Sequence, residues 1–368
     1  MRAESKTRRL VIDGTEITDA SDCYVIAEIG HNHGGSVETA KNLFEEAKNC
    51  GAHAVKLQKR DNRGLFTREA YEKPYENENS FGATYGEHRE ELEFGRAEYV
   101  ELKAFCDELG VTFFATAFDF ASADLLAELN MPAYKIASGD LTNTPLLRHV
   151  ARIGKPVIFS TGGGTLDDVR RAHATLAEEN DRIAVLQCTA GYPAEWDELD
   201  LGVIDTYRRE FPEAVVGFSS HDNGIAMAVA AYVLGSRIVE KHFTLNRAQK
   251  GTDHVFSLEP VGLRKMVRDL RRTRVAIGDG SKTVHPSEVA PATKMGKKLV
   301  AARDLPAGHV LGEGDIALKS PGDGLPPYEL ERVLGWALRV PLDEDSPLSL
   351  ELLEERLPAE GVLSAHDG

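Results

Sequence analysis

Residues 22–275 alternate regularly between short β-branched apolar runs and longer stretches with a helical period. Amphipathic segments such as LDDVRRAHATLAEEN separate the apolar runs. Eight runs are predicted as strands, and they cover Tyr24–Ile29, Ala52–Leu57, Thr112–Thr116, Ala133–Ile136, Pro156–Ser160, Ile183–Gln187, Ala214–Phe218 and Arg237–His242. Eight strand–helix units in about 250 residues favour a (β/α)8 TIM barrel, although spacing alone leaves a doubly wound sheet open.

The chain is expected to continue beyond the barrel. Residues 1–277 are predicted to form the barrel domain, 278–297 a polar linker, 298–360 a small β-rich domain and 361–368 a polar tail. Inside the barrel, residues 59–96 form a connection that is too long for an ordinary loop. Long connections of this kind are usually functional or disordered, and the aromatic residues here favour an ordered lid.

Composition excludes several classes of protein. The 43 Lys and Arg residues against 59 Asp and Glu give a net charge of −16, which argues against nucleic-acid and anionic-membrane partners. The four cysteines show no CxxC spacing, and no apolar stretch is long enough to span a membrane. Met1–Leu10 contains no apolar signal core. We therefore expect a reduced, cytoplasmic protein.

Nearly every predicted strand ends in a group that can bind or react. In a TIM barrel, catalytic residues lie at the C-terminal ends of the strands. From the first strand to the eighth, the groups are Glu28, Lys56 with Gln58, Thr116, Lys135 with Ser138, Ser160, Cys188, Ser219, and Glu240 with His242. Each group alone is weak evidence, but together they predict an active site.

Two lysines and a glycine run predict an anion site. Lys56 and Lys135 are expected to face one barrel mouth, where two cations cost energy unless an anion neutralises them. Residues 160–164 (STGGG) precede a helix with a predicted capping box, Thr165–Asp168. A glycine run alone is more often a tight turn. With two lysines nearby, we favour a phosphate bound at the helix N-terminus.

Two histidines predict a metal site. His221 and His242 are expected on neighbouring strands, with Glu240 and Asp253 close by. Such a set of ligands is typical of a divalent cation that keeps exchangeable positions. His31 and His33 lie on a glycine-rich turn and are weaker candidates.

A series of motifs follows along the chain in the order IAEIGHNHGG, KLQK, KIASGD, STGG, LQCTAGYP, GFSSH, EKHFTL and KGTDHVFSLEP. These motifs and their order resemble those of the sialic acid synthases. The segment LVAARDLPAGHVLGEGDIALKSPGDG resembles the C-terminal antifreeze-like (SAF) domain of that family. The resemblance covers residues 22–355. It implies condensation of phosphoenolpyruvate with an N-acylmannosamine or a related hexose, free or 6-phosphorylated, to give a nonulosonic acid and phosphate.

The resemblance also implies a cofactor, Mn²⁺ or Mg²⁺, and a role for each site residue. Phosphoenolpyruvate would be held by Lys56, Thr116, Lys135, Ser138, Ser160 and Ser219. The other implied site residues are the metal ligands His221 and His242, the base Glu240, the sugar-binding Glu28 and Asp253, and Tyr192. Asp253 would also take part in proton transfer. The family pattern further implies a homodimer in which the C-terminal domain covers the partner's barrel.

The sequence departs from the family pattern at three positions. Many bacterial members carry Asp where Ser220 stands and Met where Gly163 stands. In the C-terminal domain, Ser320 replaces an Arg that often reaches the acyl group of the sugar in the partner subunit. We therefore expect altered local geometry near Ser220 and Gly163, and a weaker contact with the acyl group.

Four residues carry weaker signals. Lys59, Arg60 and Arg89 could grip a sugar phosphate, but a solvated lid face is the simpler interpretation. Cys188 is interpreted as a structural cysteine, because nothing nearby in the sequence would stabilise its thiolate.

Two other functions remain open at this stage. Lys135 or Lys56 could form a Schiff base in an aldolase on the same barrel. The protein could also be a non-catalytic carbohydrate-binding protein, although the intact set of ionisable residues argues against a dead site.

Overall fold

The computed structural model describes residues 8–355. Residues 1–7 of the predicted barrel domain, 356–360 of the predicted small domain and the whole predicted tail lie outside the described part. The chain divides into two compact units between Gly278 and Asp279. Each unit is described separately below.

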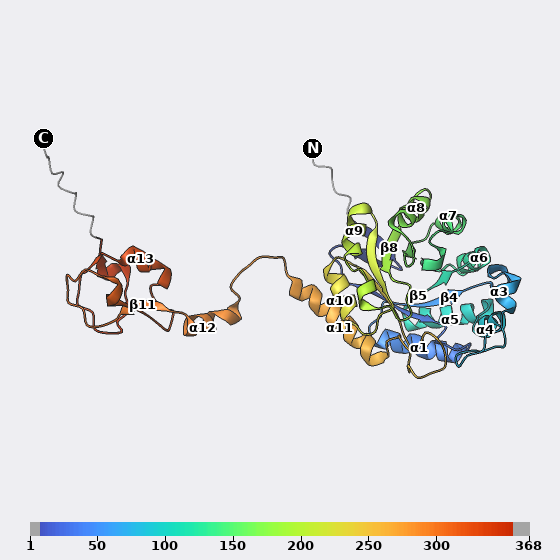
Figure 1. Ribbon diagram of the computed structural model, residues 1–368, viewed down its shortest axis with the longest axis horizontal. Helices are drawn as coiled ribbons and strands as arrows, with labels where there is room; N and C mark the ends of the chain where they lie inside the picture. Colours follow the sequence, from blue (N-terminus) through green and yellow to red (C-terminus); the bar gives the residue numbers. More distant parts are fainter. Residues whose placement is uncertain (1–7, 356–368) are drawn as a thin grey trace. The chain divides into compact units, whose positions relative to one another are not determined.

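The first unit is a closed barrel of eight parallel strands (Figure 1). The strands follow chain order around the barrel, and β10 closes it by pairing with β3, with Ile238 opposite Tyr24. The strands are β3 (Tyr24–Gly30), β4 (Ala54–Lys59), β5 (Thr112–Ala117), β6 (Tyr134–Ile136), β7 (Val157–Ser160), β8 (Ile183–Cys188), β9 (Val215–Ser220) and β10 (Ile238–His242). The closed order confirms the predicted TIM barrel and excludes the doubly wound sheet.

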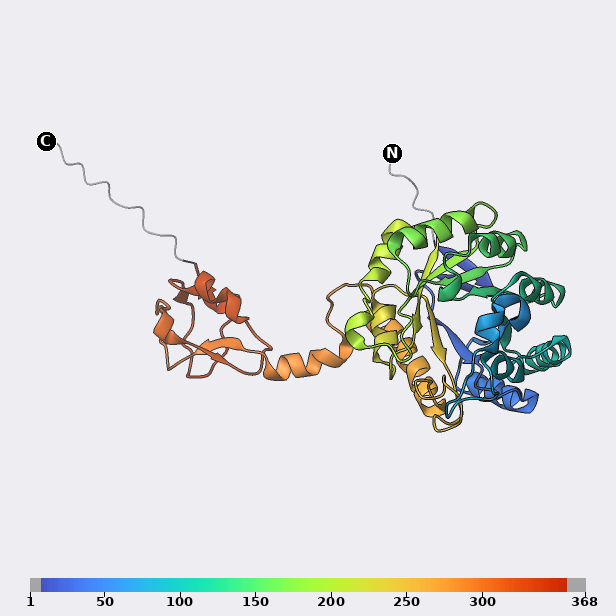
Figure 2. The ribbon, with the colours of Figure 1, turned by 45° about the vertical axis from the view of Figure 1, so that its right-hand side comes forward.

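Helices cover the outside of the barrel (Figure 2). The main ones are α1 (Val37–Asn49), α5 (Arg96–Leu109), α6 (Phe120–Glu128), α7 (Thr144–Arg152), α8 (Leu166–Ala177), α9 (Val203–Glu210), α10 (Ala226–Val233) and α11 (Pro260–Ile277). Side-chain caps fix several of their N-termini. Ser36 accepts a hydrogen bond from the backbone of Thr39 at α1. The predicted capping box of Thr165 and Asp168 at α8 is present.

An N-terminal hairpin, absent from the sequence-based prediction, packs against the inner apolar core of the barrel. It joins β1 (Arg9–Ile12) to β2 (Thr15–Thr18), and both residues of its two-residue turn, Asp13 and Gly14, have positive φ. Asp-Gly is favoured in such a turn because it tolerates this backbone. The hairpin residues Leu10, Ile12 and Ile17 share one buried cluster with the inward-facing side chains Tyr24, Ile26, Ala54, Phe114, Ala133, Ile158, Ala184, Leu186, Val215 and Ile238.

The long connection after β4 is ordered, as predicted. It contains α2 (Asn62–Leu65), α3 (Arg68–Glu72) and α4 (Tyr85–Glu91). All three helices have N-terminal side-chain caps, and α4 has a full capping box. The ring of Tyr85 lies 5.1 Å from that of Phe66 and 5.4 Å from that of Tyr75, so aromatic packing supports the segment.

The second unit begins with a helix and contains two short antiparallel sheets. Helix α12 (Pro286–Met295) occupies much of the predicted linker, and none of its residues is buried. Strand β11 (Lys298–Ala301) pairs with β12 (Ile316–Lys319), and β13 (Ala337–Leu338) with β14 (Leu353–Glu354). The short helix α13 is Leu330–Val333. Leucine side chains dominate the small core of this unit. Among the described residues of the whole chain, no helix is long and apolar enough to cross a membrane.

Candidate active site

Side chains from all eight barrel strands or the loops after them line one cavity at the C-terminal end of the barrel. The lining residues are Glu28, Lys56, Gln58, Thr116, Phe118, Lys135, Ala137, Ser138, Ser160, Cys188, Tyr192, Ser219, His221, Glu240 and His242. Every predicted site residue except Asp253 is in this lining. Asp253 lies beside it, with Oδ2 3.7 Å from Nδ1 of His242. The structure thus brings the predicted residues together.

Strand register explains this convergence. Glu28 is paired in register with Lys56 and, on its other side, with His242. Thr116 is paired with Lys135 in the same way. Because side chains alternate across a strand, residues at one level of neighbouring strands face the interior together.

The two buried lysines are balanced by protein carboxylates. Lys56 forms an ion pair with Glu28 and donates a hydrogen bond to Thr116 Oγ1 over 2.8 Å. The carboxylate of Glu240 lies 3.8 Å from the ammonium groups of both Lys56 and Lys135. The expectation that two clustered cations require a ligand anion was therefore incomplete. The sequence could not show that carboxylates on β3 and β10 lie within reach of both lysines.

The two carboxylates have opposite pKa shifts. Burial raises the pKa of Glu28 more than the ammonium of Lys56 lowers it. Burial also opposes ionisation of Glu240, but Lys135 and Lys56 together outweigh it and hold its pKa below the usual value. Burial lowers the pKa of Lys135. A pair of acids with pKa values pushed apart is suited to divide the roles of proton donor and proton acceptor.

Among residues 8–355, four buried polar atoms of the cavity lining have no hydrogen-bond partner: Glu28 Oε2, Ser160 Oγ, Glu240 Oε2 and His242 Nδ1. Of these, Glu28 Oε2 forms the ion pair with Lys56. Buried polar atoms are nearly always paired in folded proteins, and each exception requires an explanation. Their gathering around one cavity indicates that they are directed at a ligand.

The glycine run after β7 has structural reasons of its own. The amide of Gly162 donates to Ser138 Oγ over 2.9 Å, and a Cβ at Gly162 would lie 2.8 Å from that of Ala190. At the N-terminus of α8, the capping box occupies the backbone N–H groups of Thr165 and Asp168. The helix therefore has an acid of its own at this terminus, and the phosphate site there stays a prediction. Ser138 and Ser160 remain as hydroxyl groups in the cavity.

The two predicted metal ligands lie side by side, with ring centroids 5.4 Å apart. His221 Nδ1 lies 2.9 Å from the carbonyl oxygen of Thr189, an arrangement that leaves Nε2 as the ligating atom. Burial lowers the pKa of His242 to about 3, so its ring is neutral and able to ligate. Among residues 8–355, no group of three or more His, Cys, Asp or Glu side chains could hold a metal ion. The described residues therefore offer two imidazoles, and the remaining ligands of an ion bound there would be oxygen atoms of water or substrate.

His31, one of the weaker metal candidates, lies between two cations. Its Nε2 is 3.0 Å from NH1 of Arg60, and its Nδ1 is 3.1 Å from NH1 of Arg89. Two guanidinium groups repel a metal cation, so this histidine is unsuited to ligate one.

Cys188 lies in the cavity, which corrects its interpretation as a merely structural residue. Its Sγ is 3.5 Å from Ser138 Oγ and 3.9 Å from Nδ1 of His221. Burial raises the pKa of this thiol, but His221, Ser138 and Lys135 together lower it below the usual value. Its position at the end of a strand was the signal that could have placed it in the site.

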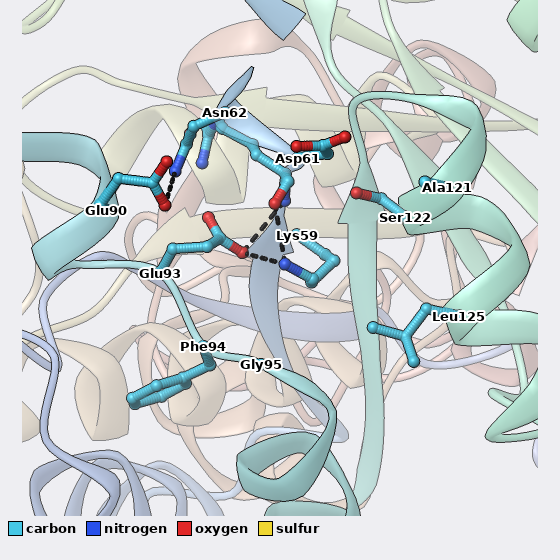
Figure 3. Close-up of a pocket in the computed structure, with 11 residues that line it drawn as sticks. Lys59, Asp61, Asn62, Glu90, Glu93, Phe94, Gly95, Ala121, Ser122 and Leu125 are labelled. Atoms are coloured by element: carbon cyan, nitrogen blue, oxygen red, sulfur yellow. Dashed lines mark hydrogen bonds and ion pairs between the residues drawn. The ribbon is translucent and has the colours of Figure 1, made fainter. Parts of the chain in front are cut away.

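Lys59, the last residue of β4, and Arg60, which follows it, are both buried, so the expected solvated lid face is wrong for both. Lys59 Nζ lies 2.7 Å from Oε1 of Glu93, in a pocket separate from the catalytic cavity (Figure 3). The central carbon of the Arg60 guanidinium lies 3.8 Å from the centre of the Phe118 ring, and Arg60 is 7% exposed. Glu93 and Phe118 come from distant parts of the sequence, so neighbours in the chain gave no sign of this burial.

Ser220 points away from the cavity and takes part in a buried network. Its hydroxyl contacts Asp222 and accepts a hydrogen bond from Lys241 over 2.8 Å. Lys241 also pairs with Asp222 at 2.9 Å. The departure at Ser220 therefore changes the layer behind β9 and not the cavity lining.

A parallel barrel whose mouth carries these ionisable groups defines the chain as a TIM-barrel enzyme. Residues 43–282 match the NeuB family, and residues 298–354 match the SAF domain. The chain belongs to the NeuB family, the sialic acid synthases, which condense phosphoenolpyruvate with a sugar.

Curated relatives cover nearly the same length. The chain is 38% identical over 333 residues to the N-acetylneuraminate-9-phosphate synthase of Homo sapiens, covering 90% of this chain and 93% of the relative. It is 34% identical to the N,N'-diacetyllegionaminic acid synthase of Campylobacter jejuni, covering 84% and 94%. These relatives confirm the family resemblance and do not favour the aldolase or the non-catalytic protein.

A solved structure shares the fold. It is the N-acetylneuraminic acid synthetase of Leptospira borgpetersenii, in complex with citrate, with a TM-score of 0.68 and 28% identity. The likeness covers 77% of this chain and 95% of that one.

Proposed function

We propose that this enzyme condenses phosphoenolpyruvate with an N-acylmannosamine or a related hexose, giving a nonulosonic acid and phosphate. The observation that carries the proposal is the cavity itself, whose lining combines two lysines, two carboxylates of unlike pKa, and the atoms Ser160 Oγ and His242 Nδ1, which have no hydrogen-bond partner among residues 8–355. Relatives named for neuraminate and legionaminate products support a hexose derivative as the second substrate.

Phosphoenolpyruvate is proposed to bind at the cationic side of the cavity. Lys56 and Lys135 are 2% and 3% exposed, and would neutralise its phosphate and carboxylate groups. The remaining proposed contacts are the hydroxyls of Thr116, Ser138, Ser160 and Ser219. The hydroxyl of Ser160 is available for this purpose, because its Oγ has no hydrogen-bond partner in the described part of the chain.

The reaction forms a carbon–carbon bond and a bond from carbon 2 to a water oxygen, and it breaks the bond from carbon 2 to the phosphate oxygen. The aldehyde oxygen takes up a proton and becomes a hydroxyl group. Carbon 3 of phosphoenolpyruvate attacks the sugar aldehyde, and the enol electrons form the carbon–carbon bond. The cationic carbon 2 takes up water, which loses a proton to Glu240, the carboxylate with the lowered pKa. The tetrahedral carbon then expels phosphate and becomes the 2-oxo group.

The remaining site residues are proposed to hold the sugar and a divalent ion. Glu28 and Asp253 would bind sugar hydroxyls, with Asp253 taking part in proton transfer, and Tyr192 would line the sugar side. His221 and His242 would hold Mn²⁺ or Mg²⁺, which supplies Lewis-acid polarisation of the aldehyde.

The fate of solvent oxygen tests the proposal. Phosphate release is measured with phosphoenolpyruvate and a panel of free and 6-phosphorylated N-acylmannosamines and mannose, in water enriched in ¹⁸O. We expect sugar-dependent release of phosphate that carries no ¹⁸O, because water attacks carbon 2. Phosphate labelled with ¹⁸O, or borohydride trapping of the substrate on Lys135 or Lys56, would overturn it.

We also propose a homodimer in which each C-terminal domain covers the partner's barrel. The test mixes two defective chains: full-length Lys135→Met, and a chain ending at Gly280. If the domain serves the partner, the mixture regains activity, because the shortened barrel receives a domain from the full-length chain. If each domain serves its own barrel, the mixture stays inactive.

A cytoplasmic location completes the proposal. The four cysteines, all within the described residues, are free and buried. Free thiols are typical of a reducing compartment.

A further inference from the structure

Two arginines beside the active site lack carboxylate partners. The guanidinium of Arg60 contacts the imidazole of His31 and donates to Oε1 of Gln58 over 2.6 Å. The guanidinium of Arg89 contacts the same imidazole and donates to the hydroxyl of Tyr85. Neither forms an ion pair within residues 8–355. Buried or half-buried arginines usually pair with an anion, so this arrangement leaves two positive charges uncompensated.

The histidine between the arginines cannot satisfy both of them. Burial and the two guanidinium groups hold the pKa of His31 well below its usual range, so the ring is neutral. A neutral imidazole has one acceptor nitrogen and one N–H donor. Both ring nitrogens face guanidinium N–H groups, at 3.0 and 3.1 Å. At one of the two ring nitrogens, the imidazole N–H therefore faces a guanidinium N–H, and the arginine on that side has no acceptor in His31.

The surroundings add positive charge. The ammonium of Lys250 lies 4.6 Å from the centre of the Phe81 ring. Burial, Arg89 and Lys250 together lower the pKa of His88 to about 4. The carboxylate of Glu93 forms an ion pair with Lys59 and makes no ion pair with Arg60 among residues 8–355. Asp253 acts on Arg60 only at longer range. The local field thus favours an anion.

The cluster is joined to the catalytic cavity by one side chain. The amide of Gln58 accepts from Arg60 at its oxygen and donates from Nε2 to Glu28 over 3.1 Å. Glu28 is a proposed ligand of the sugar hydroxyls. A charged group on the sugar, at the end away from the aldehyde, can therefore reach the two arginines while the aldehyde stays near His242.

We propose that Arg60 and Arg89, separated by His31, form a subsite for a phosphate group carried by the sugar substrate. A phosphate monoester accepts hydrogen bonds from two guanidinium forks and supplies the acceptor that His31 cannot. The subsite is distinct from the proposed phosphoenolpyruvate contacts at Lys56 and Lys135. The inference rests on the proposed condensation and selects a 6-phosphorylated hexose as its substrate.

The experiment compares kcat/KM for an N-acylmannosamine 6-phosphate and the free sugar. Arg89 is the better position to change, because it is half-buried on α4 whereas Arg60 packs in the barrel. For wild type we expect the phosphorylated sugar to be preferred. In Arg89→Met the preference should fall about ten- to a hundredfold, with Arg89→Lys intermediate. Arg68→Met, on an exposed lid arginine, is the matched control and should keep the wild-type ratio.

A binding measurement separates this inference from the condensation. Calorimetric titration of the sugar phosphate, with EDTA and without phosphoenolpyruvate, should show weaker binding in Arg89→Met than in Arg68→Met. A wild type that condenses but prefers the free sugar, or an Arg89→Met ratio equal to wild type, overturns the subsite and leaves the proposed function standing. A wild type that releases no phosphate with any sugar overturns both.

Discussion

The two levels of the barrel interior differ sharply although the same strands build them. At the floor, inward-facing side chains such as Ala54 and Ile158 are fully buried and pack under the N-terminal hairpin. Two residues further along the same strands, Lys56 and Ser160 face the mouth. The floor is built of aliphatic and aromatic side chains and carries no buried charge, although the hydroxyl of Tyr24 has no hydrogen-bond partner among residues 8–355. The mouth contains buried charges and several such polar atoms. One step of the two-residue strand period thus separates the part that stabilises the barrel from the part that reacts.

This difference has an energetic reason. Apolar burial contributes about 25 cal/mol per Å² and needs no specific partner. A buried charge repays its desolvation only with good geometry, and an unpartnered polar atom costs about 1–3 kcal/mol. The floor can therefore support a mouth that is arranged for ligands rather than for stability.

Metal removal should produce the largest effect and should affect only the mouth. EDTA is expected to abolish turnover and Mn²⁺ to restore it, because His221 and His242 are the proposed ligands. The melting temperature of the apolar floor should barely respond. Full activity in EDTA, or in a double variant His221→Ala and His242→Ala, would contradict the metal assignment.

The second-largest effect is expected when one of the two lysines at the barrel mouth is removed. In Lys135→Met the proposed contact with phosphoenolpyruvate is lost, and Glu240 loses one of its two neighbouring ammonium groups. By comparison with the loss of a single charge-stabilising donor, kcat/KM should fall about 10²–10³-fold. Steady-state kinetics on protein with a native circular dichroism spectrum provides the measurement. A fall of less than twofold would show that this lysine does not contact substrate.

Local patterns were enough to predict the frame of the molecule. The β-branched runs and glycine-bounded turns placed each of the eight barrel strands to within about two residues, as expected where the strand period is strong. The strands of the N-terminal hairpin were missed. The same period placed Lys56 and Glu240 at the mouth, because strand-end residues of a closed barrel must converge.

Contacts between residues far apart in the chain could not be predicted from the sequence. The pairing of Lys56 with Glu28 follows from the register of β3 and β4, and that of Glu240 with Lys135 from the closure of the barrel. Arg60 is buried under contacts with His31 and Phe118 that are far away in the chain. Charge balance and burial are properties of the assembled barrel, so motif spacing left them open.

A substitution in the second unit is expected to have a smaller effect, and it adds that unit to the comparison of floor and mouth. Ser320 lies in the second unit, where its hydroxyl is 2.5 Å from Nζ of Lys297. An Arg there would donate charge-assisted hydrogen bonds to an acyl carbonyl, each contributing about 1.5–3 kcal/mol. If this turn covers the partner's mouth, Ser320→Arg should raise the preference for N-acetylmannosamine over mannose about ten- to a hundredfold.

The ratio of kcat/KM for the two sugars measures this preference. It should be compared in wild type and in Ser320→Arg proteins of equal oligomeric state. An unchanged ratio would mean that this turn does not contact the acyl group.

The smallest effect, and the most direct test of the comparison, uses two neighbouring inward positions on β7. Ile158 belongs to the floor and Ser160 to the mouth. Ile158→Val removes one buried methylene and should lower the free energy of unfolding by about 0.5–1.5 kcal/mol while kcat/KM stays unchanged. Ser160→Ala removes a hydroxyl that has no partner in the protein, so stability should be kept or slightly raised. Its kcat/KM should fall about tenfold, because the proposed hydrogen bond to phosphoenolpyruvate is lost.

Denaturant unfolding and steady-state kinetics on the two variants should therefore show opposite patterns. If Ser160→Ala destabilises the protein as Ile158→Val does, the hydroxyl stabilises the fold and the separation of floor from mouth fails on this strand.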